Sequence, residues 1–431
     1  SASSQNCSAN RKICNAIKKL NLYRVILVAG TTPAAIPEKF LKEEPVDFVC
    51  DREGFKTPIQ LLEYLKNGGS LAGVQDLWWK KFQYYNMQEV LNITDNTLYF
   101  TFRGKLLNQQ ELDSIKIPAW QLVERNGKLE HYTCHNWHSF NTGHQQNYAS
   151  IYTSFGCIFK CEFCCIGSPF GDMHDGSSRS YRLISPNIVV NQIEHLVKHY
   201  GVTNIKFVDE MFVLNKKHVL GICDEIIKRD LGNKINIWAY CRIDTSKEEY
   251  LPKLKQAGFN WLCLGIESGS KYVRDGAEKK FTNDNIKQVV KTIQDAGINI
   301  IANYIFGLPD DSIERMQETL DLANELNCEF ANFYSSACYP GSPLYKMATE
   351  TGLELPDDWS GYSQHSYTTK PLSNKYCSSA DILQFRDNSH INYFSRKEYQ
   401  DMVFKKFGQY ALDEIKKMLA LGKPRRKILG E

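Results

Sequence analysis

The chain has 431 residues, of which 42% are hydrophobic and 23% charged, and its formal net charge is +3. This length allows two or three domains with their own cores, and the small net charge gives no reason to expect a nucleic-acid partner. No apolar run approaches the roughly 20 residues that a membrane span needs, and no signal peptide is visible. The 14 cysteines are scattered through a large chain, which favours free thiols in a reducing, cytoplasmic compartment.

The first quarter of the sequence alternates helical patterns with short apolar runs. Helices are expected near residues 7–20, 37–41 and 58–66, buried strands near 22–29 and 46–50, and a hairpin across 92–102. This alternation predicts a layered α/β domain over residues 1–117. A linker is expected over residues 118–148.

From residue 149 the pattern becomes a run of strand–helix units. Strands are expected at 150–155, 204–209, 234–240, 260–266, 298–305 and 329–336, and helices at 186–200, 216–229, 247–257, 284–296 and 312–326. Six strands alternating with five helices predict a partial (β/α)6 TIM-like barrel over residues 149–350. Functional groups of such barrels lie at the carboxyl ends of the strands. A mainly helical region is expected over 351–431, with the basic run 423–427 as a solvated tail.

Three cysteines, Cys157, Cys161 and Cys164, follow the first expected barrel strand. Their C-x3-C-x2-C spacing allows one loop to bind three irons of a 4Fe–4S cluster, which usually has four thiolate ligands. The fourth iron would then remain open for chemistry. The competing interpretation is three buried cysteines spaced by chance.

This loop, with Phe163 just before its third cysteine, resembles the signature of the radical S-adenosylmethionine (SAM) superfamily. The resemblance implies that the open iron chelates the amino and carboxylate groups of SAM. An electron delivered by an external donor of the flavodoxin or ferredoxin type then cleaves SAM into methionine and a 5′-deoxyadenosyl radical. Phe163 matches the aromatic position that lies near the adenine.

The ends of the next two expected strands resemble motifs that bind the methionine part of SAM. Asp209 and Glu210 occupy the place of the ammonium-binding motif, and the two remain alternatives because Val208-Asp209 stands where the family often has glycines. A helix N-cap carboxylate is the competing interpretation. Arg242 is expected to bind the methionine carboxylate, with a salt bridge to Asp244 as the alternative.

The remaining strand ends resemble motifs for the nucleoside part of SAM. Glu267 and, more weakly, Ser268 match the ribose motif, and Gly307 opens the adenine motif Gly307-Leu308-Pro309. Cys338, after the sixth strand, is a candidate hydrogen-atom donor, although a packed thiol is the simpler interpretation. A group with metal-like composition but no zinc spacing is expected to line the approach to the barrel: His131, Cys134, His135 and His138.

Residues 1–117 resemble part of the Rossmann-like cobalamin-binding domain that precedes the barrel in one large radical SAM subfamily. The resemblance implies that cobalamin contacts two loops, formed by Gly30, Thr31 and Thr32 and by Glu53 and Gly54. It also implies that the opening strand, helix and strand of such a domain are missing from this sequence. No D-x-H-x-x-G motif is present, so binding without a protein ligand to cobalt is expected. A vestigial domain that binds nothing is the competing interpretation.

These resemblances together imply a cobalamin-dependent radical SAM methyltransferase acting at an unactivated carbon of a small-molecule or natural-product-like substrate. The radical would abstract a substrate hydrogen, and cobalamin would supply the methyl group. One alternative is a radical rearrangement, dehydration or cyclisation enzyme with a structural N-terminal domain. The other is a non-catalytic iron–sulfur scaffold or redox partner. The sequence does not identify the substrate.

Overall fold

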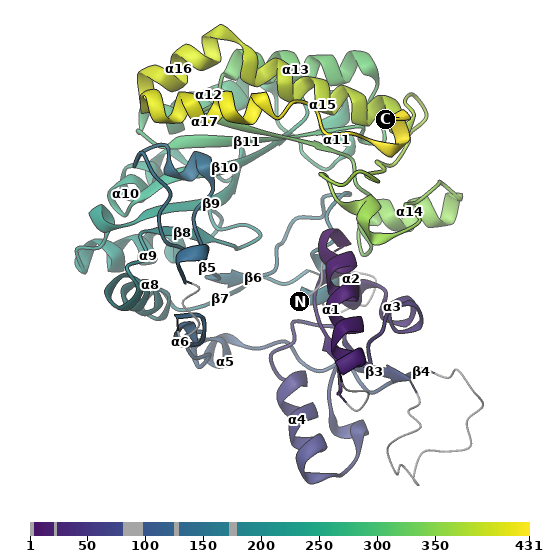
Figure 1. Cartoon of the computed structure of the whole chain (residues 1–431). Coiled ribbons are helices and arrows are strands. Elements are labelled where there is room, and N and C mark those ends of the chain that lie inside the picture. Colours follow the sequence, from purple (N-terminus) through teal and green to yellow (C-terminus); the bar gives the residue numbers. More distant parts are fainter. Residues whose placement is uncertain (1–3, 21–23, 81–97, 125–128, 172–178) are drawn as a thin grey trace.

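The computed structural model describes residues 4–431 except for 21–23, 81–97, 125–128 and 172–178. An N-terminal unit, drawn in purple in Figure 1, lies beside one edge of a large curved sheet that carries helices on its outer side. Within the described residues, no helix is long and apolar enough to cross a membrane.

The N-terminal unit is a small mixed sheet in the order β1-β2-β3-β4. β1 and β2 are parallel, whereas β3 and β4 are antiparallel to their neighbours. The strands are β1 (Leu27–Val28), β2 (Phe48–Cys50), β3 (Leu77–Lys80) and β4 (Leu98–Phe100), and the helical segments are η1 (Ser4–Asn6), α1 (Cys7–Leu20), α2 (Thr31–Ala35), α3 (Pro37–Glu43), α4 (Thr57–Asn67) and η2 (Leu71–Gly73).

β3 pairs with β4, which lies at the end of the segment 92–102 where a hairpin is expected. Trp79 pairs with Tyr99, and their rings stack with centroids 5.1 Å apart. The aromatic run therefore forms a strand of its own, because large rings on facing strands stabilise the pair. Residues 92–97 of the expected hairpin lie outside the described residues.

The segment between the two units contains α5 (Gln109–Asp113), α6 (Trp120–Glu124), η3 (Leu129–His131) and η4 (Asn136–Ser139). Its last part, around η4, closes the amino ends of the barrel strands. Nε2 of His138 lies 2.9 Å from the carbonyl oxygen of Asn236, where β9 begins, and the Trp137 ring packs on Trp238 and Trp261. The segment is thus an aromatic plug rather than the lining of an approach, since the approach to a barrel site is at the opposite strand ends.

The large sheet is a six-stranded, entirely parallel half-barrel in the order β12-β11-β10-β9-β8-β5. Its strands are β5 (Tyr148–Ile151), β8 (Asn204–Phe207), β9 (Asn236–Arg242), β10 (Phe259–Glu267), β11 (Asn299–Phe306) and β12 (Phe330–Ser335). A two-stranded antiparallel ribbon, β6 (Ser154–Phe155) and β7 (Arg182–Leu183), follows β5. This arrangement confirms the expected half-barrel fold.

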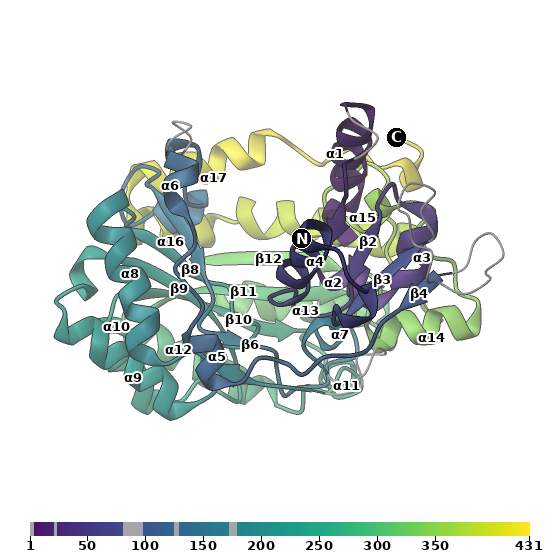
Figure 2. The same cartoon turned by 90° about the horizontal axis from the view of Figure 1, so that it is seen from below.

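Helices cover the outer face of the half-barrel, as Figures 1 and 2 show. They are α8 (Pro186–Tyr200), α9 (Lys216–Lys228), α10 (Leu251–Gln256), α11 (Lys271–Gly276), α12 (Asn283–Asp295) and α13 (Ile313–Leu326), with short turns η5 (Gly232–Lys234) and η6 (Glu248–Tyr250). In contrast, α7 (Gly167–Phe170), which contacts α2, and α14 (Pro343–Thr351) lie on the side of the N-terminal unit. Side chains alternate between the two faces of a strand. In β8, Ile205 and Phe207 are fully buried in the core against the helices, whereas Lys206 between them is half-buried on the inner face.

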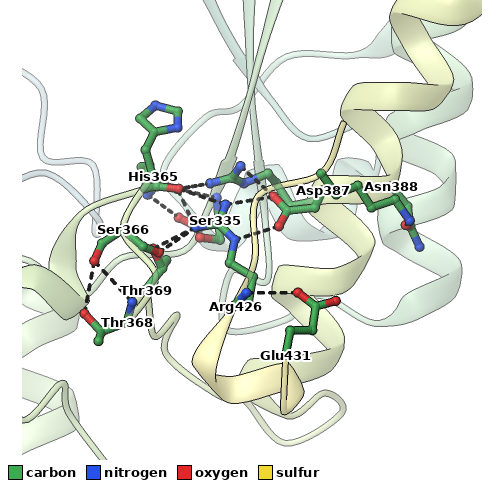
Figure 3. Close-up of polar contacts among 12 residues, drawn as sticks. Ser335, His365, Ser366, Thr368, Thr369, Asp387, Asn388, Arg426 and Glu431 are labelled. Carbon is green, nitrogen blue, oxygen red and sulfur yellow. Dashed lines mark hydrogen bonds and ion pairs between the residues drawn. The ribbon is translucent and has the colours of Figure 1, made fainter. Parts of the chain in front are cut away.

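The C-terminal region packs against the last strands of the sheet. It consists of η7 (Trp359–Tyr362), α15 (Ser379–Ser395), α16 (Lys397–Phe407), α17 (Gln409–Ala420) and η8 (Lys427–Leu429). Figure 3 shows that Arg426, within the expected solvated tail, contacts Asp387 and the segment around Ser366. This buried anchor fixes the tail to the C-terminal region. Nε of Arg426, a fully buried side chain, lies 2.8 Å from Oδ2 of Asp387, and Nη1 donates to the carbonyl oxygen of Ser366 at 2.7 Å. The solvated-tail interpretation is wrong for Arg426 because a buried carboxylate neutralises its charge.

Polar contacts on two sides attach the N-terminal unit to the rest of the molecule. Nη2 of Arg52, which is buried, donates to the carbonyl oxygen of Gly171 at 2.8 Å, just after the helix that follows the three cysteines. The indole N–H of Trp359 donates to Glu44 on the other side of the unit. The unit is therefore fixed both to the barrel and to the C-terminal region.

Candidate active site

The loop that carries the three cysteines leaves the barrel at a position where only glycine fits. Gly156 has φ +86°, and a Cβ there would lie 2.3 Å from the carbonyl oxygen of Ser180. The loop then turns so that the N–H of Cys164 donates to the carbonyl oxygen of Cys161 at 3.1 Å. Cys157 and Cys161 are buried and Cys164 is half-buried, so all three thiols sit in one shielded loop.

The surroundings of these thiols suit an anionic iron–sulfur cluster. Burial raises the pKa of Cys157, and the nearby charge of Cys161 raises it further. Nη1 of Arg242 donates to Sγ of Cys161 at 3.4 Å, and the guanidinium lies 3.7 Å from the centre of the Phe159 ring. A fixed cation beside thiolates offsets the cost of their burial.

Among the described residues, no group of three His, Cys, Asp or Glu side chains is arranged to hold a single metal ion. This does not conflict with a cubane, because each thiolate of a 4Fe–4S cluster binds a different iron and the sulfurs need not converge on one point. Cys165, next in the chain, has its pKa raised to about 12, mainly by burial.

Asp209 and Glu210, at the end of β8, differ sharply in their surroundings. Asp209 is buried and accepts hydrogen bonds from the N–H of Thr153 at 2.7 Å and from the hydroxyl of Ser154 at 2.8 Å. These bonds fix the bend between β5 and β6. No hydrogen bond from a described residue reaches Glu210, so its carboxylate retains its full capacity to accept.

Glu210 lies where the cluster loop meets the middle of the barrel. Its charge is felt by Cys157 and Cys164 on the loop and by Tyr152 and Tyr240 on the neighbouring strands. Burial, and then the charge of Asp209, raises the pKa of Glu210 to about 7. A cationic ligand beside it would lower that pKa and would be held by a charge-assisted bond.

Arg242 already has partners. Its Nε and Nη2 lie 2.8 and 2.9 Å from the two carboxylate oxygens of Asp244, which is the salt bridge that the sequence left as an alternative. Together with the contact to Cys161, this pairing makes Arg242 a brace for the cluster loop. Its expected contact with the methionine carboxylate remains a prediction.

Glu267, expected at the ribose, ends β10 in an unusual conformation. Its φ is +69°, and the register of β10 shifts between Gly265 and Glu267. Such positive φ values in residues other than glycine cluster at functional sites. Nζ of Lys279 donates to Oε1 of Glu267 at 2.6 Å, which leaves the second carboxylate oxygen available. Ser268 is a weaker candidate, since it is buried and its hydroxyl bonds with Thr319 at 3.0 Å.

Gly307, expected at the adenine, also needs to be glycine. Its φ is +81°, and a Cβ there would lie 2.6 Å from side-chain carbons of Ile382 in α15. Its N–H donates to Oδ2 of Asp311 at 2.9 Å. Phe163 from the cluster loop packs in the same apolar group as Leu308, so the structure brings the two expected adenine contacts together.

Cys338 lies in an apolar group with Leu344, Ala348 and Leu372, against which Phe163 also packs. Its thiol is buried, and burial raises its pKa to about 12. This is the packed thiol that the sequence left as the simpler interpretation. Its expected hydrogen-donor role therefore remains only a prediction.

A cavity of about 540 Å³ lies between the N-terminal unit and the barrel. The N-terminal unit contributes Gly30, Thr31 and Glu53, which are three of the expected cobalamin contacts, and the barrel contributes Glu210 and Ser150. The remaining wall is largely apolar and includes Phe55, Leu112, Ile115, Ile117, Pro118, Ile151, Phe155, Ile166, Pro169, Phe170, Ile184 and Ile188. The cavity thus joins the loops expected for one cofactor to a residue expected for the other.

Two expected cobalamin contacts do not line this cavity. The Thr32 hydroxyl is buried and lies 2.7 Å from the hydroxyl of Ser4. Gly54 has φ +76° and faces Ala29, with 3.4 Å between the Ala29 Cβ and a Cβ built on Gly54. Both residues shape the loops rather than the wall.

Sequence reasoning missed the aromatic residues of the barrel wall. Tyr152 and Phe155 line the cavity, and their rings stack with centroids 5.0 Å apart. Phe155 also meets Phe55 of the N-terminal unit edge-on at 5.3 Å. Their position just before the first cysteine was the available signal, because a side chain between a strand end and the cluster loop must face the site.

The family follows from comparison with known proteins. Residues 151–323 match the model of the radical SAM superfamily, and this stretch includes the cluster loop, Glu210, Glu267 and Gly307. This stretch of the chain therefore matches a radical SAM domain, and it contains the three-cysteine loop and most of the half-barrel.

Curated proteins extend the similarity beyond the barrel. An uncharacterized methyltransferase of Pyrococcus horikoshii is 26% identical over 88% of this chain and 74% of its own length. The anaerobic magnesium-protoporphyrin IX monomethyl ester cyclase of Rubrivivax gelatinosus is 27% identical over 58% of this chain and 43% of its own length.

A solved structure shares the fold over both units. The structure of the cobalamin-dependent SAM radical enzyme OxsB, determined with aqua-cobalamin and SAM bound, matches with a TM-score of 0.66 and 16% sequence identity. The match covers 94% of this chain and 61% of OxsB. The chain thus shares the fold of OxsB over most of its own length, although it spans less than two thirds of the length of OxsB.

Proposed function

We propose that this protein is a cobalamin-dependent radical SAM methyltransferase that acts at an unactivated carbon of a small organic substrate. The observation that supports this most is the cavity between the units. It places Gly30, Thr31 and Glu53 opposite Glu210, so that a flat cofactor between them would face the SAM site. The methyltransferase relative and the cobalamin-dependent structural relative point to the same chemistry.

The donor sets of the chain fit the three cofactors. Three shielded thiols with a neighbouring guanidinium fit a 4Fe–4S cluster. A carboxylate without a hydrogen bond from a described residue fits the SAM ammonium, and a largely apolar wall fits a corrin ring. When bound, the cluster, SAM and cobalamin supply the radical and the methyl group.

The chain's own residues then have binding and positioning roles. Glu210 accepts hydrogen bonds from the ammonium group of SAM. Glu267, which is held by Lys279, accepts hydrogen bonds from the ribose hydroxyls. The backbone at Gly307 contacts the edge of the adenine beside Phe163. The apolar wall excludes water from the space between the two cofactors, which protects a reactive radical from side reactions.

The test begins with protein purified from cells that are supplied with cobalamin. We expect corrinoid absorption bands beside the cluster absorption, at about one corrinoid per chain. After SAM and a reductant are added, we expect both 5′-deoxyadenosine and S-adenosylhomocysteine. The absence of corrinoid would make the N-terminal unit structural, and 5′-deoxyadenosine without S-adenosylhomocysteine would reject methyl transfer.

The cyclase relative supports a second candidate, a radical rearrangement, dehydration or cyclisation in which the N-terminal unit has only a structural role. That reaction would consume SAM without forming S-adenosylhomocysteine. A non-catalytic iron–sulfur scaffold would form neither product. The same product analysis therefore separates all three functions.

The proposed reaction sets conditions on the cell. Reduction of the cluster requires an external one-electron donor of the flavodoxin or ferredoxin type. An oxygen-sensitive cluster with free thiols around it is suited to a reducing compartment, so we place the protein in the cytoplasm.

A further inference from the structure

Lys206 occupies an unusual position on the inner face of the half-barrel. Its neighbours in β8, Ile205 and Phe207, are fully buried on the helix side, so the Lys206 side chain points to the opposite, concave side. Its Nζ lies 4.5 Å from the centre of the Trp238 ring and 5.5 Å from that of Tyr240, both on the neighbouring strand.

The ammonium of Lys206 has aromatic partners but no anionic one. No carboxylate among the described residues lies within 4.0 Å of its Nζ. Burial lowers the pKa of Lys206, whereas the charges of Cys263 and, more weakly, of Glu210 raise it. Contact with aromatic faces recovers only part of the cost of placing a charge in a half-buried site.

The charge of Lys206 is not needed to build the sheet. Methionine would fill the same space against Trp238 and Tyr240 without the cost of desolvation. Most other long cations of the barrel have a carboxylate partner, such as Lys279 with Glu267 or Arg229 with Glu194. A costly group without a structural task is a candidate for binding a ligand.

Lys206 also lies beside the proposed active site. It pairs in register with Ser150, and both Ser150 and Glu210, four residues further along the chain, line the cavity between the units. Below it, toward the amino ends of the strands, the aromatic plug closes the barrel with Trp137 against Trp238. A molecule that enters the barrel from the cavity would therefore meet Lys206 before it meets this floor.

The inner face around Lys206 is polar as well. Asn332 donates to Asn303 at 2.9 Å across β11 and β12, and both side chains are half-buried, as is Tyr334. A sheet face that is packed as a core would carry apolar residues instead. These groups fit a small organic molecule better than a hydrophobic core.

We propose that Lys206 binds an oxyanion, a carboxylate or a phosphate, on the substrate of this enzyme and thereby selects anionic substrates. The proposal rests on the proposed function, because it assigns the substrate to the space between the cluster loop and the aromatic plug. The bound oxyanion would replace the missing counter-ion of Lys206, and charge-assisted bonds of this kind are about twice as strong as neutral ones.

The test uses the full chain with its oxidised cluster reconstituted, saturating SAM and no reductant. Three probes of similar shape are titrated by fluorine NMR: 4-(trifluoromethyl)benzoate, 4-(trifluoromethyl)phenyl phosphate and the neutral 4-(trifluoromethyl)benzamide. We expect at least one of the two anions to bind about tenfold more tightly than the amide, a difference of about 1.4 kcal/mol. The stronger of the two anions identifies the class of oxyanion.

Matched variants connect this preference to Lys206. In Lys206→Met the preference for the anion should disappear, and in Lys206→Arg it should remain. Lys234→Met is the control, because it removes the same charge from an exposed residue paired with Asp230 at 3.0 Å. Cluster absorption and thermal melting of each variant show whether it is folded, and the arginine variant keeps the test decisive if the methionine variant is not.

Several results would overturn the proposal: equal binding of the amide, no binding of either anion, or an unchanged anion preference in Lys206→Met. An about tenfold weaker binding of SAM itself to Lys206→Met would also overturn it, because Lys206 would then hold the carboxylate of SAM. Formation of 5′-deoxyadenosine by the wild-type protein is measured separately with reductant. Its failure would refute the proposed function without deciding the anion preference.

Discussion

The carboxyl ends of the barrel strands and the N-terminal wall of the cavity present different kinds of group. At the strand ends, charged residues are held by specific bonds, as Lys279 holds Glu267 and as Thr153 and Ser154 hold Asp209. The N-terminal wall combines Gly30 and Thr31 with the charged Arg52 and Glu53 and the apolar Phe55.

This difference reflects what each side would bind. A small ligand with an ammonium, a carboxylate and hydroxyls needs particular donors and acceptors, which restricts the residue at each position. A large flat ring needs shape and apolar surface, which many residues can supply. The barrel strand ends therefore leave recognisable motifs in a sequence, whereas the N-terminal side leaves only short loops such as Gly30-Thr31 and Glu53-Gly54.

The largest expected effect is loss of the cluster. Alanine at Cys157, Cys161 or Cys164 should reduce bound iron and lower 5′-deoxyadenosine formation to background, because three thiolates are the fewest that hold the open-iron cluster. Cys165→Ala is the matched control, since it removes the adjacent buried thiol and should retain the cluster absorption. Equal loss in Cys165→Ala would show that the ligand set has been misassigned.

The second prediction separates two neighbouring carboxylates. Glu210→Gln should weaken SAM binding by about 30-fold, since a hydrogen bond to a charged group contributes about 2 kcal/mol. Asp209→Asn should instead lower the free energy of unfolding by about 2 kcal/mol, because Asp209 accepts bonds from Thr153 and Ser154. Equilibrium dialysis and thermal melting measure the two effects. If the Glu210 variant melted early and bound SAM normally, the two roles would have to be exchanged.

The third prediction concerns the N-terminal side of the cavity. Thr31→Trp should fill part of the space that Thr31 lines and weaken cobalamin binding by about tenfold, because overpacking costs 1–3 kcal/mol. SAM binding should change much less, and Thr31→Ser serves as the control. Cobalamin is measured by its visible bands after gel filtration. Normal cobalamin content in Thr31→Trp would place the corrin elsewhere.

The smallest effect on activity is expected at Asp311, whose carboxylate accepts a hydrogen bond from the N–H of Gly307. Burial raises the pKa of Asp311 to about 7 from 3.8, so the stability that the protonated carboxyl contributes is present at low pH and is lost as the pH rises through about 7. Because asparagine cannot ionise, Asp311→Asn should keep that stability at high pH. Its free energy of unfolding there should exceed that of the wild type by up to about 4 kcal/mol. Melting curves at about pH 5 and pH 9 measure the difference, and parallel pH profiles of the two proteins would contradict the assignment.

The sequence predicted the half-barrel closely. Five of its strands lie within two residues of the expected limits at either end, because apolar runs separated by amphipathic helices are a strong signal. The first strand differs, since β5 and β6 are separated at Tyr152 and Thr153. The cause is Asp209, which binds the N–H of Thr153 and bends the chain, and such a tertiary bond is not visible in local periodicity. The limits of the domains themselves remain predictions.

Site residues were predictable by position but not by role. The sequence placed Asp209, Glu210 and Arg242 at the ends of the strands, yet only the structure shows that Asp209 is fully bonded and that Arg242 is paired with Asp244. The burial of Arg426 was equally hidden, because its partner Asp387 is 39 residues away in the chain. Pairing over such distances depends on how helices pack, which one sequence does not state.

The buried anchor at Arg426 has a consequence for the order in which the protein is made. Gln364 bonds with both the N–H and the carbonyl oxygen of Ser335 at the end of β12, and its own carbonyl oxygen accepts from Arg426 at 3.3 Å. The end of the last barrel strand thus depends on a residue roughly 90 positions downstream. At about 5–20 residues per second, a ribosome needs about 5–18 seconds to reach that residue. During this interval Arg426 cannot yet bond Gln364, so the cluster loop is synthesised well before this support for the end of β12 exists.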